Sequence, residues 1–320
     1  MATIKESLTA FFDGDHHVAL VEVARAKGST PREEGARMLV SPTSIHGTIG
    51  GGQLEFMAID KARQMLRSSP SPLREGSTRE AERGGGGSAA LDPAQSPPGP
   101  SGHPPRKGEG KIVTLDVPLG PEIGQCCGGR VEVSIRLVDE ELETDLIRNA
   151  QVEDARLPYI YIFGGGHVGH ALASAFALLP IHVAVVETRA DALEGIPAGV
   201  ATKLTAVPEE MVRSAPAGAA FVVLTHDHAL DFLIVAEALK RKDAAYVGMI
   251  GSKTKKATFR SWYLKSAEGS EADFARLVSP IGGDAVKDKR PAIIAALAAA
   301  EIMTALAARS NATSAKSIAG

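Results

Sequence analysis

The chain has little cysteine. Only two cysteines occur in 320 residues, and they are neighbours, Cys126 and Cys127. Adjacent cysteines rarely form a disulfide with each other, because the Cα and Cβ spacing of a disulfide suits chain segments that approach from a distance. A tetrahedral zinc site would need a second set of Cys or Cys and His ligands, which this pair lacks. The pair is therefore a reactive or metal-ligating thiol site, or two inert side chains.

The sequence also lacks an excess of charge and a long apolar leader. A formal net charge of -3 argues against broad electrostatic binding to nucleic acid or to anionic lipid. Residues 1–17 contain acidic side chains and no long apolar run, which does not fit a signal peptide, so we expect a cytoplasmic protein. The apolar stretch from Ala292 is short, rich in alanine and interrupted by Glu301, so we expect a packed terminal helix and no membrane partner.

Apolar residues are scarce between residues 68 and 110. These 43 residues contain 8 Pro, 9 Gly and 7 Ser, and no aromatic residue. Such a composition cannot bury enough apolar surface to offset the entropy of ordering. We therefore predict a disordered insertion over 68–110 within a first domain made of residues 1–67 and 111–140. A charged, helix-like linker over 141–156, a second domain over 157–310 and a flexible tail over 311–320 complete the predicted organisation.

The segments on both sides of the insertion indicate a small α+β domain. Residues 17–26 and 36–40 are typical of strands, and residues 53–66 are typical of an amphipathic helix. After the insertion, apolar residues alternate with period two in "KIVTLDV" and "RVEVSIRLV". These two strands suit a hairpin in which Val113, Leu115 and Val117 lie opposite Val131, Val133 and Ile135. The two cysteines lie in the connection between the strands.

The second domain has a different pattern. Short apolar strands such as "YIYIF", "IHVAVVE" and "FVVLT" alternate with helical stretches. This alternation predicts a parallel sheet covered on both faces by helices. The expected fold class is thus α/β, with a small N-terminal α+β domain followed by a C-terminal Rossmann-like domain.

A glycine motif follows the first strand of this second domain. Gly164, Gly166 and Gly169 fit G-x-G-x-x-G at the start of a helix that begins near His167, and Glu187 ends the next strand. Glycine permits a tight turn and the close approach of a diphosphate, and an acid in that place can accept hydrogen bonds from a ribose. The alternative is that the glycines serve helix–sheet packing alone.

Two further stretches place polar residues after strands. In "THDHALD", His226, His228 and a carboxylate could hold a metal, or Asp227 or a histidine could cap the following helix. In "GMIGSKTKK", hydroxyls and cations that include Ser252 and Lys253 could bind phosphate, or could form a solvated basic face. In the first domain, "GSTPREEGARM" offers Arg32 and Arg37 as phosphate ligands, and "GTIGGGQLE" repeats the glycine loop before a helix. The alternative for both of these stretches is turn chemistry alone.

Seven stretches in this order resemble the xanthine dehydrogenase accessory protein family (XdhC/CoxI). They cover most of residues 17–300, and their combination is far more specific than any one of them: "GSTPREEGARMLV", "GTIGGGQLE", "CCGG", "FGGGHVGHALA", "THDHALD", "YVGMIGSKTK" and "SPIG". The family element is Cys-Gly-Gly, which Cys127, Gly128 and Gly129 match. Cys126 is an additional thiol, and the insertion at 68–110 departs from the family pattern.

The resemblance implies a chaperone for the molybdenum cofactor rather than an enzyme. Such a protein binds molybdopterin as cargo, keeps it while a cysteine desulfurase helps to install the terminal sulfido ligand, and delivers it to apo xanthine dehydrogenase, working as an oligomer, expected to be a homodimer. Thiolate is a soft ligand that suits molybdenum, so Cys127 is the candidate metal ligand. The residues that we expect to bind the cofactor are Cys126, Cys127, Gly128, Gly129, Gly164, Gly166, His167, Gly169, Glu187, His226, Ser252 and Lys253.

Two other functions use some of the same residues. An NAD(P)-dependent oxidoreductase would use the glycine motif and Glu187, although the sequence offers no convincing set of proton donors for hydride transfer. A metal-dependent hydrolase would use His226, His228 and Asp231.

Overall fold

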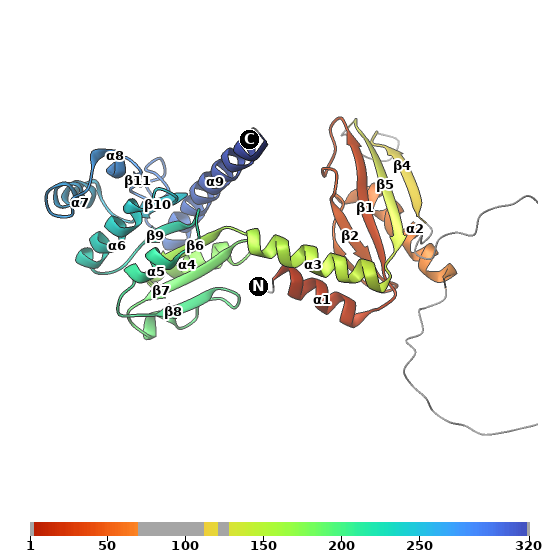
Figure 1. Ribbon diagram of the computed structural model, residues 1–320, viewed down its shortest axis with the longest axis horizontal. Coiled ribbons are helices and arrows are strands. Elements are labelled where there is room, and N and C mark those ends of the chain that lie inside the picture. The colour runs from red at the N-terminus through yellow and green to blue at the C-terminus, as the bar shows by residue number, and fades with distance from the viewer. Residues whose placement is uncertain (1–2, 70–111, 121–127, 319–320) are drawn as a thin grey trace, which may run out of the picture. The chain divides into compact units, whose positions relative to one another are not determined.

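The computed structural model describes residues 3–69, 112–120 and 128–318, with side chains described as far as residue 310. The chain divides into two compact units, one of residues 4–151 and one of residues 152–320 with the first three residues. They are coloured from red to yellow-green and from green to blue in Figure 1. Residues 70–110 of the predicted disordered insertion and both cysteines lie outside the described residues, whereas Ser68 and Ser69 form the end of a helix.

The N-terminal unit contains a five-stranded sheet with the strand order β3-β2-β1-β5-β4. All described pairs in this sheet are antiparallel. Val113, Leu115 and Val117 pair with Ile135, Val133 and Val131, which confirms the hairpin expected from the period-two alternation. The strands are β1 (Ala19–Lys27), β2 (Arg37–Val40), β3 (Ile45–Gly47), β4 (Val113–Pro118) and β5 (Arg130–Leu137).

Helices cover this sheet on its two faces. Helix α2 (Gly52–Ser68) buries Leu54, Ala58 and Ala62 against alternate residues of the strands, as the amphipathic pattern predicted. Helices α1 (Ile4–Gly14) and α3 (Glu140–Arg156) form a second core on other strand residues, among them Leu20 and Leu39. The N-terminal unit is therefore an α+β domain, as expected.

Helix α3 covers the segment that the sequence assigned to a helix-like linker. Its residues Leu146 and Ala150 are buried in the same core as Phe12 of α1. The boundary between the two units falls inside the helix, between Gln151 and Val152. Most of the predicted linker is therefore a packed helix of the N-terminal unit.

The C-terminal unit contains a six-stranded parallel sheet with the order β11-β10-β9-β6-β7-β8. Short strands alternate with helices along the chain, which confirms the predicted Rossmann-like arrangement. The strands are β6 (Tyr159–Phe163), β7 (His182–Glu187), β8 (Ala201–Leu204), β9 (Ala220–Val223), β10 (Tyr246–Met249) and β11 (Leu277–Val278). The helices are α4 (His167–Phe176), η2 (Asp191–Leu193), α5 (Glu209–Ser214), α6 (His228–Lys240), α7 (Lys253–Ser266), α8 (Glu271–Phe274) and α9 (Pro291–Ile318).

Alternate strand residues enter two separate cores. Ile160 and Ile162 of β6 lie in one core with residues of α4 and α9, whereas Tyr161 and Phe163 lie in the other with residues of α5, α6 and α7. Both faces of the central strands are thus buried, which explains why their sequences are apolar throughout rather than alternating.

Helix α9 is long and apolar. One face packs into the core beside α4 through Ala295, Ala298 and Ile302, as predicted for a packed terminal helix. Its stretch Pro291–Ser310 is also the one part of the described chain whose length and composition would allow it to cross a membrane, and 22% of that stretch is buried. The helix continues to Ile318, through most of the segment predicted as a flexible tail.

Candidate functional site

The order of the parallel strands marks a place for ligand binding in the C-terminal unit. From β6 the chain adds β7 and β8 on one side, then crosses back to add β9, β10 and β11 on the other side. The order therefore reverses between β6 and β9. In open parallel sheets ligands bind beyond the carboxyl ends of the strands at such a point. The glycine motif follows β6 and the His-Asp-His stretch follows β9, so both lie at this edge.

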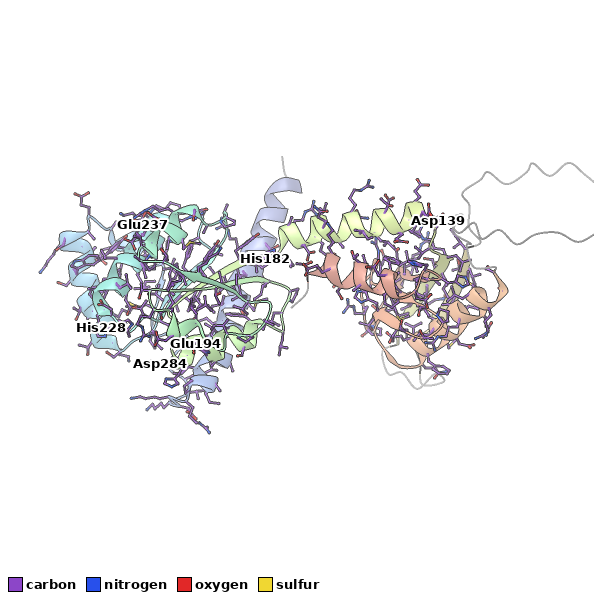
Figure 2. The ribbon with its side chains drawn as sticks, turned by 90° about the horizontal axis from the view of Figure 1, so that it is seen from below. Asp139, His182, Glu194, His228, Glu237 and Asp284 are labelled. Carbon is purple, nitrogen blue, oxygen red and sulfur yellow. The ribbon has the colours of Figure 1, made fainter. Side chains whose placement is uncertain are left out.

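Other polar residues lie at the same edge because their strands run in the same direction. Figure 2 labels His228, Glu194 and Asp284 toward one side of the C-terminal unit, away from His182 at the start of β7. Ser252 and Lys253 follow β10, and Glu187 ends β7. The eight residues that the sequence proposed as ligand-binding in this unit therefore all belong to segments at the carboxyl edge or, for His167 and Gly169, to the first turn of α4.

The glycines of the motif have two different roles. Gly164 has a φ of +117°, and a Cβ atom on it would lie 2.6 Å from the carbonyl oxygen of Leu224. A Cβ atom on Gly169 would collide with the carbonyl oxygen of Gly164. A Cβ atom on Gly166, in contrast, would meet no atom within 4 Å. Gly164 and Gly169 are thus required by packing, and Gly166 leaves space open at the start of the helix.

The N-terminus of α4 differs from those of the next two site helices. Gly166 is the N-cap of α4 and provides no side-chain cap. Asp227 caps α6 by accepting bonds from the amides of Ala229 and Leu230, and Ser252 caps α7 by accepting a bond from the amide of Lys255. The N-cap alternative for Asp227 is therefore confirmed. Of these three helices, only α4 has no side chain at its N-cap that accepts hydrogen bonds from the first backbone amides.

Glu187 is tied to the glycine loop. One carboxylate oxygen accepts a hydrogen bond from the amide of Gly165 (2.9 Å), and the other accepts bonds from Thr188 and from the amide of Arg189. Burial of Glu187, which is 5% exposed, raises its pKa, but these hydrogen bonds outweigh burial and hold the pKa below its usual value. The charged carboxylate of Glu187 thus already accepts hydrogen bonds from the glycine loop and from the two residues that follow Glu187. Its contact with a ligand stays a prediction.

A buried ion pair links the segments after β9 and β10. Asp231 is fully buried and receives hydrogen bonds from the amide and the hydroxyl of Thr225, at 3.0 and 2.7 Å. The ammonium group of Lys255 forms an ion pair with the same carboxylate. Sequence reasoning missed this arrangement, because it treated Asp231 only as a metal ligand.

The three lysines at the start of α7 have different surroundings. Lys255 pairs with Asp231, and Lys256 donates to the carbonyl oxygens of Leu277 and Ser279. Lys253 is 88% exposed and lies 3.8 Å from the exposed carboxylate of Asp284. Lys253 is therefore the lysine of this group whose charge is open to a ligand, and the stretch is not a uniformly solvated basic face.

The described residues contain no group of three His, Cys, Asp or Glu side chains that could hold a metal ion. Asp231, one of the proposed ligands, is occupied by Thr225 and Lys255, and the other two, His226 and His228, are exposed. The structure therefore does not support the metal-dependent hydrolase with His226, His228 and Asp231.

In the N-terminal unit three loops that are distant in the sequence lie together. Gly128 forms a parallel β-bridge with Ser29. A Cβ atom on Gly129 would lie 2.6 Å from the carbonyl oxygen of Lys27 and would collide with that of Ser29. The two glycines of the Cys-Gly-Gly element are thus packed on the "GST" segment, whereas Cys126 and Cys127 themselves lie outside the described residues.

The glycine loop before α2 joins this cluster. A Cβ atom on Gly50, which has a φ of +122°, would lie 2.6 Å from Cβ of Pro31 and 3.3 Å from Cγ of Arg32. Residues 27–32, 48–52 and 128–129 therefore form one group, which we call the three-loop cluster. Arg37, the second arginine of the "GSTPREEGARM" stretch, instead pairs with Glu22 at 3.4 Å.

Glu55 occupies the amides of the glycine loop. Its carboxylate accepts hydrogen bonds from the hydroxyl of Thr48 (2.5 Å) and from the amides of Ile49 and Gly51. Burial raises its pKa, but the hydrogen bonds outweigh burial and lower the pKa overall. A phosphate would meet this negative charge, so the loop before α2 is better explained as a self-capped turn than as a phosphate site.

Comparisons with known proteins cover both units. The family model described as "XdhC and CoxI family" matches residues 13–75, and the one described as "XdhC Rossmann domain" matches residues 160–302. The chain belongs to the XdhC and CoxI family. The match to the Rossmann domain covers the glycine motif, Glu187, the Asp231–Lys255 pair and the first part of α9 as far as Ile302.

Two proteins resemble this XdhC family chain over most of its length. "Uncharacterized protein YqeB" of Escherichia coli K12 is 25% identical over 295 residues, which are 89% of this chain and 43% of that protein. The chain thus spans less than half of that relative. A crystal structure from Bacillus halodurans described as a xanthine dehydrogenase has a TM-score of 0.70 at 16% identity, over 96% of this chain and 97% of that one. This second likeness shows the shared fold.

Proposed function

We propose that this XdhC family chain is an accessory protein that binds the molybdenum cofactor as cargo. It holds the cofactor while a cysteine desulfurase supplies the terminal sulfido ligand, and it delivers the loaded cofactor to apo xanthine dehydrogenase. It acts in the cytoplasm as a homodimer and catalyses no reaction of its own. Family membership supports this proposal, and the solved structure described as a xanthine dehydrogenase has the same fold.

The observation that carries the proposal is the three-loop cluster. Gly128 and Gly129 follow Cys127 directly in the sequence, and both glycines pack against residues 27–29. Arg32 belongs to the same cluster. A guanidinium suits the phosphate of molybdopterin and a thiolate suits molybdenum, so Arg32 of the cluster and Cys127, which precedes Gly128 in the sequence, are the two kinds of group that this cargo requires.

The experiment is to express the protein in a host that makes molybdopterin and to analyse the purified protein by mass spectrometry and absorbance. We expect the wild-type protein to carry the cofactor. Cys127→Ala should retain less of it with an unchanged circular dichroism spectrum, and Cys126→Ala tests whether the second thiol contributes. Equal cofactor content in wild type, both single variants and the double variant would remove the role of the thiols.

A second candidate is an NAD(P)-dependent oxidoreductase. The open space at Gly166, at the point where the strand order reverses, favours it, because a dinucleotide diphosphate could approach the start of α4 there. Thermal-shift titrations distinguish the two functions. Strong, saturable stabilisation by NAD(H) or NADP(H), with none by molybdopterin, would favour the oxidoreductase.

A further inference from the structure

The ion pair between Asp231 and Lys255 is the most deeply buried one described in the chain. The side chain of Asp231 is 0% exposed and that of Lys255 is 8% exposed. The free energy needed to remove two charges from water offsets much of the free energy gained from their attraction. Two apolar residues of similar shape often give a protein of equal or greater stability. A contribution to stability alone is therefore a weak explanation for the pair.

Asp231 fixes the loop that follows β9. It lies in the first turn of α6, and it accepts hydrogen bonds from both the amide and the hydroxyl of Thr225. The same hydroxyl lies 2.9 Å from the carbonyl oxygen of Asp227. The hydroxyl of Thr225 therefore connects the backbone on both sides of His226 to the carboxylate of Asp231.

Lys255 fixes the loop that follows β10. Gly251 has a φ of +154°, and a Cβ atom on it would lie 2.6 Å from Cδ of Lys255. The aliphatic stem of Lys255 thus covers Gly251, and its ammonium group reaches the carboxylate of Asp231. Through this one contact the segment that carries Ser252 and Lys253 is connected to the segment that carries His226.

We propose that Asp231 and Lys255 are positioning residues that set the separation of these two loops for a phosphate-bearing ligand. The ligand itself meets His226, Ser252 and Lys253, and the buried pair touches none of it. Neither charge of the pair is free to bind an anion, because each is neutralised by the other. That the ligand is the cofactor rests on the proposed function, whereas the positioning role requires only that the ligand carries phosphate.

The test compares stability with affinity in one variant. Asp231→Asn with Lys255→Met removes both charges together, so no unpaired buried charge remains, and asparagine can still accept from Thr225. The control is Arg260→Met with Glu271→Gln, which removes an ion pair between α7 and α8 of the same unit that is exposed on both sides. The probe is inorganic diphosphate, followed by calorimetry, and urea unfolding followed by the fluorescence of Trp262 measures stability.

We call the protein with Asp231→Asn and Lys255→Met the positioning variant. We expect it to bind diphosphate about tenfold more weakly, because that is the loss expected when a charge-assisted contact is misplaced. Its unfolding midpoint should be close to that of the control. A purely structural pair would give the opposite result, a lower midpoint with an unchanged affinity of the folded protein. Wild-type affinity in the positioning variant would overturn the inference.

A double-mutant cycle provides a second readout. If the pair sets the separation of the loops, the effects of His226→Ala and Lys253→Ala on diphosphate affinity are coupled in the wild-type background and become additive in the positioning variant. Coupling that survives in the variant would contradict the proposal, as would a wild-type protein that binds no diphosphate. Cofactor content is measured separately, so a protein that binds diphosphate through these loops but never carries molybdopterin would refute the proposed function and leave the positioning role intact.

Discussion

The carboxylate of Glu187 accepts a hydrogen bond from the backbone amide of Gly165 over 2.9 Å. Glu187 ends β7 and Gly165 lies in the turn after β6, so this bond joins the ends of two neighbouring strands. The turn is otherwise built of glycines with no side chains to hold it. Glu187 therefore helps to hold the loop that carries Gly166.

Replacing Glu187 by glutamine should destabilise the C-terminal unit. The Glu187→Gln change removes the charge that accepts bonds from Gly165, Thr188 and Arg189 and turns one acceptor into a donor. We expect a loss of about 1–3 kcal/mol in the free energy of unfolding. Trp262, the single tryptophan, packs against Phe232 and Phe259 in this unit, so its fluorescence measures the change. Glu194→Gln, an exposed change in the same unit, is the control and should be close to neutral.

The contribution of Glu187 should depend on pH. Its pKa in the folded protein lies below the usual value, so its stabilising effect is complete above the pKa of an unfolded glutamate, about 4.3, and is lost as the pH falls through the lower folded pKa. The difference in unfolding free energy between wild type and Glu187→Gln should therefore shrink in acid below about pH 4. A difference that stays constant down to pH 2, or grows, would contradict the ionised hydrogen-bonded carboxylate.

Two glycines of the same loop should respond differently to alanine. Gly164→Ala forces a strained φ and a clash with the carbonyl oxygen of Leu224, so it should cost about 1–3 kcal/mol of stability. Gly166 has an ordinary φ of -76° and open space around it, so Gly166→Ala should leave stability nearly unchanged. If ligands approach the start of α4, the added methyl group should weaken binding of diphosphate or of the cofactor. Undiminished binding by Gly166→Ala would place the ligand elsewhere.

The sequence predicted those parts of the fold that depend on apolar periodicity. The alternation in residues 111–117 and 130–138 identified β4 and β5 and even their paired residues, because every second side chain of each strand packs against the core. The continuous apolar strands likewise identified the parallel sheet. Helix α1 and strand β8 were missed. Every residue of β8 is exposed, so no pattern of burial marks it in the sequence.

The contacts between polar groups could not be predicted in the same way. Nothing in the spacing of Asp231 and Lys255, 24 residues apart, shows that they meet. The same holds for the packing of Gly129 on Lys27 and Ser29, which depends on the pairing of β1 with β5. The sequence showed that glycines and charges gather after strands, but only the tertiary structure shows which of their amides and charges are already in use.

The contact between Gly129 and the "GST" segment can be tested by substitution. Gly129→Ala places a methyl group against the carbonyl oxygens of Lys27 and Ser29, so the loops must separate, at a cost of about 1–3 kcal/mol. Gly120→Ala is the matched control, because a Cβ atom there would meet nothing within 4 Å. Hydrogen exchange of β1 and β5 measures the effect in this unit, which has no tryptophan. Equal exchange in the two variants would show that the two loops are not packed together in solution.

Arg32 provides the sharpest test of cargo binding in the N-terminal unit. It is exposed, its stem packs beside Gly50 in the three-loop cluster, and its guanidinium can bind a phosphate through two parallel hydrogen bonds. Arg32→Ala should therefore reduce the cofactor content of the purified protein about tenfold or more, the loss expected for a charge-assisted bond. Arg67→Ala removes the same charge from the last turn of α2, about 20 Å along the helix from its start, and should retain the cofactor. If both variants lose cofactor equally, the effect is one of net charge, and if neither does, the phosphate is bound outside the three-loop cluster.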